Sequence, residues 1–164
     1  MNYTYLFKNV FVKTFLTLLT FAFIPVLHAQ EKDSALQKII ESKRFVFRAQ
    51  SASPQRSGTK QLTSEYDVKL LGDSIISYLP YFGRAYSAPM GTGGGGIQFT
   101  SSQFTYSNKK KNKGWDITIT PKDAGDVRQL FFSISNSGYA RLQVTSNNRE
   151  PISFNGIIES LKPL

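Results

Sequence analysis

The residues best suited to hold another molecule lie in one short stretch, YLPYFGRAY, which spans residues 78 to 86. It combines four aromatic rings with one arginine, whose guanidinium can stack on a ring or hold an anionic group. Such a set is typical of a pocket mouth that takes a ligand. It equally suits a packed corner with a solvated arginine, because most aromatic rings belong to protein cores. The candidate ligand-binding residues are Tyr78, Tyr81, Phe82, Arg84 and Tyr86.

A glycine-rich stretch, MGTGGGG from Met90 to Gly96, has the glycine spacing of a phosphate-binding loop. The dinucleotide-binding fingerprint requires a helix after the glycines, whereas residues 97–100 have the composition of a strand. A P-loop requires a lysine directly after its last glycine, and this chain has Ile97 there. The glycines are therefore interpreted as a flexible connection that leads into a strand.

A run of lysines, KKKNK, lies between two segments with strand patterns. We predict that these lysines occupy the solvated tip of a hairpin, where loops usually carry such residues. The alternative is an electrostatic contact with an anionic surface, which salt would weaken. The candidate residues for that contact are Lys109, Lys110, Lys111 and Lys113.

Few catalytic chemistries are open to this chain. It has no Cys, and its only His is His28, near the N-terminus. Asp123 and Asp126 lie three residues apart but lack the rest of a calcium-binding loop. We therefore expect no metal, no cofactor and no enzymatic activity. The acids that could supply the catalytic carboxylate pair of a hydrolase are Glu65, Asp67, Asp116 and Glu150.

The first 29 residues are predicted to be a secretory signal peptide that is removed from the mature protein. Lys8 and Lys13 precede an apolar run over residues 15–27, and the small residue Ala29 follows. The run is short for a membrane span, although a retained N-terminal anchor is the alternative. Residues 30–164 are then expected to form a single β-rich domain, which is periplasmic or secreted and lacks a lipid-modified Cys.

The charge of the chain indicates what it meets. The formal net charge is +9, of which Lys8 and Lys13 contribute two. An exported protein with this charge is expected to contact an envelope protein, a lipid or a glycan, and no nucleic acid is expected.

One helix and a series of strands must position these residues. Residues 34–43 are predicted to be helical, because Leu36, Ile39 and Ile40 form a narrow apolar stripe. After them the apolar residues recur at every second position, which indicates strands. Gly72-Asp73 is predicted to be a hairpin turn, as are residues 136–138. The predicted strands cover residues 44–48, 66–70, 74–78, 97–99, 104–106, 115–120, 130–134, 139–145 and 152–154.

Two segments are predicted to lie outside the strands. Residues 51–61, SASPQRSGTKQ, are polar and rich in turn formers, so they are expected to form a loop. Residues 155–161 are expected to form a short turn or helix after the last strand. The connections are too short for parallel crossovers. We therefore predict a mainly β fold, an antiparallel curved sheet or small barrel of eight or nine strands with one N-terminal helix packed on it.

Several segments resemble a known family, the exported proteins of Bacteroidetes grouped as domain-of-unknown-function family 4251. The similarity lies in FVFRAQ at residues 45–50, Gly72-Asp73, YLPYFGRAY, the glycines before Ile97, and GYARL from Gly138. It covers nearly the whole of the predicted mature chain. The resemblance implies an exported single domain and carries no activity, cofactor or catalytic residue.

These observations favour a non-catalytic binding domain of the cell envelope, with a small apolar or amphiphilic ligand held at residues 78–86. The alternative is a protein–protein interaction module, such as an inhibitor or an envelope assembly factor, which would use an open sheet face and the lysine run. A carboxylate-based hydrolase is a third interpretation.

Overall fold

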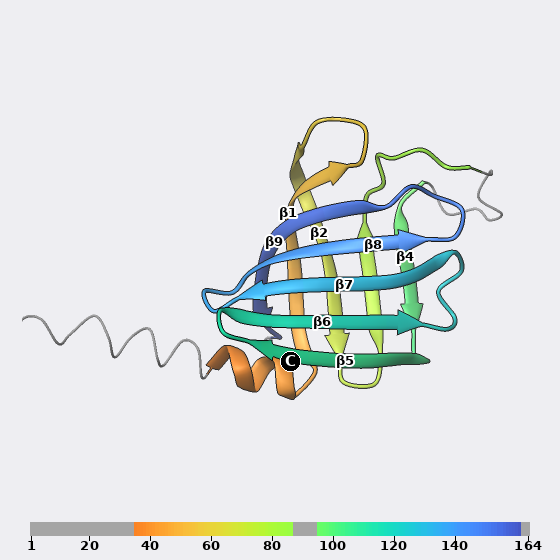
Figure 1. The fold of residues 1–164 in the computed structure, drawn as a ribbon. Coiled ribbons are helices and arrows are strands. Elements are labelled where there is room, and N and C mark those ends of the chain that lie inside the picture. Colours follow the sequence, from red (N-terminus) through yellow and green to blue (C-terminus); the bar gives the residue numbers. More distant parts are fainter. Residues whose placement is uncertain (1–34, 87–94, 162–164) are drawn as a thin grey trace, which may run out of the picture. The chain divides into compact units, whose positions relative to one another are not determined.

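Among the residues that the structure describes, nine antiparallel strands and one short helix make up the fold, which is seen in a computed structural model of the chain (Figure 1). The structure describes residues 35–86 and 95–161, and the helix covers residues 35–41. The strands are β1 (Arg44–Pro54), β2 (Lys60–Leu71), β3 (Ile75–Leu79), β4 (Ile97–Ser101), β5 (Phe104–Lys111), β6 (Gly114–Pro121), β7 (Val127–Ser135), β8 (Tyr139–Ser146) and β9 (Ile152–Ser160).

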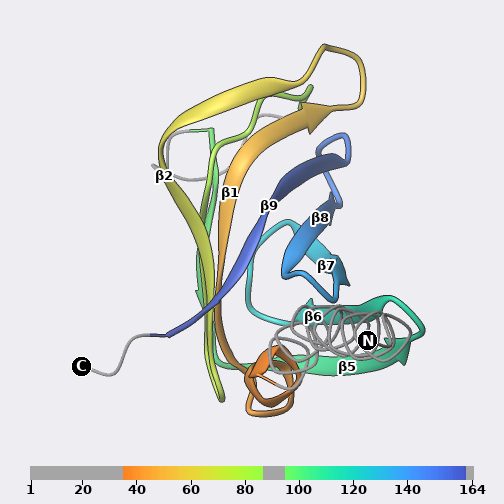
Figure 2. The same ribbon diagram turned by 90° about the vertical axis from the view of Figure 1, so that its left-hand side faces the viewer.

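The strands form a single sheet in the order β4-β3-β2-β1-β9-β8-β7-β6-β5. Only the pair β1–β9 joins strands that are not consecutive in the chain, so two meanders meet along that pair. The edge strands β4 and β5 are linked by Ser102 and Gln103 alone, which brings the two edges of the sheet together. Figure 1 shows β5 to β8 running across β1 to β4, and Figure 2 shows from the side how the sheet curls from β2 and β1 through β9 to β5. The predicted fold is thereby confirmed as a nearly closed, barrel-like antiparallel sheet.

Period-two alternation explains which side chains enter the interior. In β6, β7 and β8 the apolar residues at alternate positions are buried, while their neighbours face outward. Phe45 and Phe47 of β1 pack edge-on against Phe132 of β7, with ring centroids 6.0 and 5.6 Å apart. These contacts fasten one meander to the other through the middle of the core.

The helix packs beside β5 through its apolar stripe (Figure 1). Leu36 and Ile40 are buried in the core, and Ile39 is partly buried against it, as the spacing predicts. Tyr106 of β5 donates a hydrogen bond from its hydroxyl to the Ile40 carbonyl oxygen, at 3.1 Å. Ile40 is the most deeply buried residue of the helix, with no exposed surface.

The prediction of a loop over residues 51–61 is wrong at both of its ends. Ser51 to Pro54 continue β1, and Lys60 and Gln61 begin β2, so only residues 55–59 connect the strands. The turn-forming composition is misleading because these residues pair with both β2 and β9, and this pairing outweighs their local preference. Ser51 and Ala52 are buried at a shift in register that lies opposite both β2 and β9.

The prediction of a turn or helix at residues 155–161 is also wrong, because β9 continues to Ser160. Asn155 and Gly156 have the composition of a strand break. Gly156 is instead required by a close approach, since a Cβ at this position would overlap the Arg48 carbonyl oxygen of β1.

The predicted signal peptide, residues 1–29, and the glycines from Gly91 to Gly94 lie outside the described residues. Across residues 35–86 and 95–161, no helix combines the length and the apolar character that a membrane crossing requires.

Candidate functional site

The stretch YLPYFGRAY leaves the sheet at the end of β3. Leu79 is the last residue of the strand, and residues 80–86, here called the corner, run across to the connection between β8 and β9. The Tyr86 amide donates to the Asn148 carbonyl oxygen at 2.8 Å, and the Glu150 amide donates to the Arg84 carbonyl oxygen at 3.0 Å. Pro80 has no amide hydrogen to offer a ladder, which explains why the strand ends there.

Tyr81 fastens the corner from inside. Its hydroxyl lies 2.8 Å from the Arg84 carbonyl oxygen and 2.9 Å from that of Glu150, so its single hydrogen is shared between two acceptors. Partial burial raises the pKa of the Tyr81 hydroxyl, although the positive charge of Arg149 partly opposes the shift. The hydroxyl therefore stays protonated and keeps donating at physiological pH.

Gly83 is required because of the Tyr81 ring. A Cβ on Gly83 would lie 2.5 Å from the Tyr81 hydroxyl oxygen and 2.7 Å from the ring carbon that bears it. The space beside Gly83 is thus already occupied by the Tyr81 side chain. Only glycine lets the ring fold back over the corner backbone.

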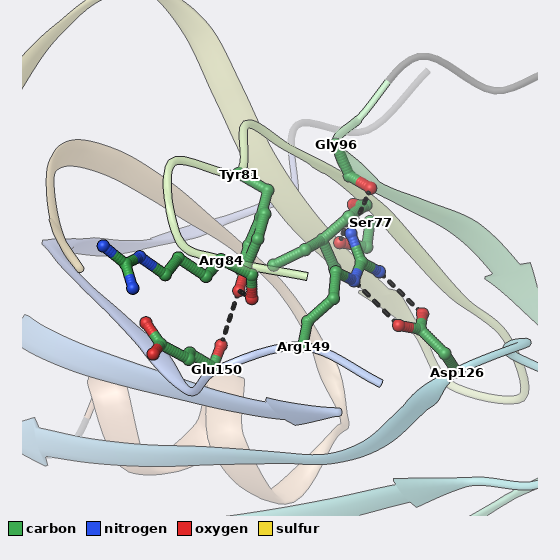
Figure 3. A network of polar contacts seen from close by, with 8 residues as sticks. Ser77, Tyr81, Arg84, Gly96, Asp126, Arg149 and Glu150 are labelled. Carbon is green, nitrogen blue, oxygen red and sulfur yellow. Dashed lines mark hydrogen bonds and ion pairs between the residues drawn. The ribbon is translucent and has the colours of Figure 1, made fainter. Parts of the chain in front are cut away.

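Arg149 lies in the connection between β8 and β9 and packs against Tyr81 of the corner (Figure 3). Its Nε and Nη2 donate to the two carboxylate oxygens of Asp126 at 2.7 and 2.6 Å, and its Nη1 donates to the Gly96 carbonyl oxygen at 2.9 Å. The guanidinium carbon lies 4.9 Å from the centre of the Tyr81 ring. Only 11% of the Arg149 side chain is exposed, so the planar pairing is largely shielded from water.

This arginine joins four parts of the chain that are distant in sequence. Asp126 belongs to the connection between β6 and β7, Gly96 leads into β4, and Tyr81 follows β3. Sequence reasoning chose Arg84 as the arginine of this region and did not identify Arg149. The only local signal is an arginine–acid pair, Arg149-Glu150, within a polar connection, and that pattern does not reveal the distant Asp126.

Arg84 has a different position. Its carbonyl oxygen accepts the hydrogen bonds from Tyr81 and Glu150, while its side chain is exposed. In Figure 3 that side chain points away from the pair between Arg149 and Asp126. The guanidinium is thus accessible to an incoming anionic group, whereas that of Arg149 is engaged.

The aromatic rings of the stretch divide into an anchored and an exposed set. Tyr81 is anchored, whereas Tyr78, Phe82 and Tyr86, here called the exposed rings, have 49%, 41% and 70% of their surfaces exposed. Tyr78 stacks on Tyr66 of β2 with ring centroids 5.7 Å apart. The Nζ of Lys60 lies 5.5 Å from the centre of the Phe82 ring. The exposed rings therefore stand on the surface, and Phe82 has a lysine beside it.

The four acids considered for a hydrolase are each held in a different ion pair. Glu150 is 97% buried but reaches the exposed Arg56, with its Oε1 3.0 Å from Nε. Glu65 lies 3.8 Å from Arg48. The other pairs are Asp67 with Lys69, at 3.2 Å, and Asp116 with Lys111.

The acids considered for calcium are also engaged. Asp126 binds Arg149, and Asp123 accepts a hydrogen bond from the Ser101 hydroxyl, which lowers the pKa of the Asp123 carboxyl. Within the part of the chain that the structure describes, no three potential metal-binding side chains gather in one place.

The prediction that the lysine run forms a hairpin tip is wrong for three of its members. Lys109, Lys110 and Lys111 belong to β5 and pair with residues of β6 from Asp116 to Gly114, and only Lys113 lies in the turn. The ladder with β6 extends as far as Gly114, and both Gly114 and Trp115 are buried. Lysines on an edge strand also discourage pairing with a second sheet.

Two of these lysines make local contacts. Lys110 Nζ donates to the Gln37 side-chain oxygen at 2.8 Å and lies 5.5 Å from the Trp115 ring centre, and Lys111 pairs with Asp116. An anionic partner would have to compete with these contacts.

Comparison with known proteins places the chain by similarity. Residues 28–158 match the family model described as "Domain of unknown function (DUF4251)". The fold is similar to the crystal structure of a DUF4251 family protein from Bacteroides eggerthii DSM 20697, with a TM-score of 0.58 and 13% sequence identity. The similarity covers 79% of this chain and 87% of that one. No curated protein matches the chain.

Proposed function

The chain belongs to the DUF4251 family, whose description names no activity, and from this premise we propose a non-catalytic binding function in the cell envelope. The ligand we propose is a small apolar or amphiphilic molecule, and its binding surface is formed by the exposed rings of residues 78–86.

One observation carries the proposal. Four large hydrophobic side chains are exposed among the described residues, and three of them, Tyr78, Phe82 and Tyr86, belong to one stretch of nine residues. Exposed apolar groups cost hydration free energy, and their concentration at one place is typical of a contact surface. The fourth, Tyr139, lies at the start of β8 and outside this stretch.

The anchoring of the corner supports the same function. Tyr81, Arg149 and Asp126 hold the backbone that carries Phe82 and Tyr86, so the points from which these rings project are fixed. A surface that is ordered before the ligand arrives loses less conformational entropy on binding.

The basic side chains beside the rings favour an amphiphile over a purely apolar ligand. Lys60 lies over the Phe82 ring, and Arg84 projects into solvent from the same corner. An apolar ligand body can cover the rings while an anionic head group meets the two cations. The absence of Cys and of any His after position 28 supports a function that needs no thiol or imidazole chemistry.

A titration with anilinonaphthalene sulfonate, which joins an apolar ring system to a sulfonate, tests the proposal. We expect the double variant Phe82→Ala/Tyr86→Ala to bind the dye about tenfold more weakly, because two apolar surfaces are removed. Thr105→Ala, at an exposed position of β5 outside both candidate sites, is the control and should leave the affinity unchanged. Thermal unfolding of each variant checks that the fold survives. Equal affinity in the wild type and the double variant would contradict the proposal.

A further inference from the structure

A second candidate site lies on the outer face of the sheet, at the opposite end of β8 from the corner. It is an open groove of about 370 Å³ over β7, β8 and β9, next to the hairpin that joins β7 to β8. This volume lies within the range of small-molecule sites. Its lining includes Gln50, Lys113, Ser133, Tyr139, Arg141 and Asn155.

Strand register explains why these side chains share one face. Ser133, Arg141 and Asn155 are direct partners across β7, β8 and β9. Their neighbours Phe132, Leu142 and Phe154 form the next row and are buried in the core. Because side chains alternate across a sheet, the row that contains Arg141 points outward.

The groove lies in the interior of the sheet and away from its edges. β7, β8 and β9 each pair with a strand on both sides, so their backbone groups are already used in ladders. A peptide therefore cannot dock here by adding a strand. Recognition has to come from the side chains that stand on the groove floor.

Those side chains are polar and basic, and two of them are held in place. Arg141 Nη2 donates to the Ser153 hydroxyl at 3.3 Å, and Asn155 Nδ2 donates to the Ser51 hydroxyl at 3.4 Å. Lys113 adds a second positive charge, and the lining contains no acid. Gln50, Asn155 and Ser133 offer both donors and acceptors, which suits a ligand with many hydroxyl groups.

Tyr139 supplies a flat apolar surface in the same groove. It is 65% exposed, and its backbone position is two residues from Arg141 on the same face of β8. Two such residues are about 7 Å apart along a strand, so one small ligand can contact both. An acidic sugar offers three kinds of group that suit this lining. Its apolar face suits the Tyr139 ring, its carboxylate suits the Arg141 guanidinium, and its hydroxyls suit the amide and hydroxyl side chains.

We propose that this groove binds an acidic sugar, a pyranose that carries a carboxylate. The sugar ring lies against Tyr139, and the carboxylate meets Arg141 with support from Lys113. The amides of Gln50 and Asn155 hydrogen-bond the hydroxyls. This site is separate from the corner in place and in ligand class.

The test uses calorimetric titration of the purified protein with trigalacturonic acid. Its fully methyl-esterified form is the matched uncharged probe, and pentaglutamate is the acidic probe without a sugar ring. We expect trigalacturonic acid to bind at least about tenfold more tightly than either, because charge and ring both contribute. Arg141→Ala should weaken binding about tenfold or more, and Tyr139→Ala about fivefold. Tyr139→Phe should stay within about twofold of the wild type, because it keeps the ring.

Several results would overturn the proposal. They are no binding up to about 10 mM trigalacturonic acid, equal or tighter binding of pentaglutamate, or an unchanged affinity in folded Tyr139→Ala. The Phe82→Ala/Tyr86→Ala variant should bind trigalacturonic acid like the wild type. That control separates this site from the proposed function of the corner, so either can fail without the other.

Discussion

Two tyrosines of this fold meet their surroundings through the same two contacts. The Tyr81 hydroxyl donates to the Glu150 carbonyl oxygen while Arg149 lies 4.9 Å from the ring centre. The Tyr106 hydroxyl donates to the Ile40 carbonyl oxygen while Lys43 lies 5.0 Å from the ring centre. The first pair of contacts fastens the corner, and the second fastens the helix to β5.

The two cations differ in what else holds them. Arg149 is largely buried and makes three hydrogen bonds, two to Asp126 and one to Gly96. Lys43 is exposed and lies at the end of the helix, where its backbone φ is 54°. A shielded, bidentate guanidinium gives both energy and geometry, whereas an exposed ammonium over a ring gives at most a small stabilisation. We therefore expect Arg149 to contribute much more to the stability of the fold than Lys43.

The largest expected effect on the free energy of unfolding comes from the removal of Arg149, the cation that contacts Tyr81. Arg149→Ala should lower the free energy of unfolding by about 3 kcal/mol, because Asp126 and the Gly96 carbonyl lose their partner while partly buried. Lys43→Ala, the matched change at the helix, should cost about 0.5 kcal/mol. Urea unfolding of both variants measures the difference. Equal losses would mean that the two contacts carry similar energy and that the comparison fails.

An intermediate effect on stability is expected from a methyl group added at Gly83, beside the Tyr81 ring. Gly83→Ala should destabilise the protein by about 1 to 2 kcal/mol, because the added methyl group collides with the Tyr81 ring. In a Tyr81→Ala background the same change should cost little, so the two substitutions should be coupled. A double-mutant cycle by denaturant unfolding gives the coupling energy. Additive losses would indicate that Gly83 is needed for its backbone conformation instead.

The smallest effect is confined to alkaline pH and compares the two hydroxyls. Burial raises the pKa of Tyr106 from 10.0 to about 12, so the folded state keeps a proton that the unfolded chain loses first. The resulting stabilisation is complete below pH 10 and is lost as the pH rises towards 12. Unfolding free energies measured across that range should fall less steeply in Tyr106→Phe. Tyr81→Phe should change the slope less, because Arg149 opposes the shift of the Tyr81 pKa. A larger change in Tyr81→Phe would reverse this ranking.

Features with a local cause were predictable from the sequence. Gly72 adopts a φ of 93° in the turn between β2 and β3, and Gly138 a φ of 88° between β7 and β8. Both turns depend on the conformational freedom of a glycine at a fixed place, which the sequence displays. The apolar stripe of the helix and the alternation in β6 to β8 depend on the same short range.

Features that depend on pairing with another strand were not predictable from local composition. Ser51 and Ala52 have loop-like composition, yet β2 and β9 pair with them on both sides. Lys109 to Lys111 read as a hairpin tip, yet β6 continues their ladder. The partner strand β9 of Ser51 and Ala52 is distant in the chain, whereas β6 directly follows the lysines. In both cases strand pairing outweighs the local preference.

The stretch YLPYFGRAY contains features of both kinds, some set by its local sequence and others by tertiary contacts. Its composition by itself predicted a strand that ends close to residue 78 and rings that gather there, and the strand does end at Leu79, directly before Pro80. Only the tertiary structure decided which ring is anchored and which rings are exposed, and that Arg149 rather than Arg84 organises the corner. The reason is physical: burial and hydrogen bonding of Tyr81 and Arg149 depend on Asp126, Gly96 and Glu150, which meet only when the sheet curls and its loops come together.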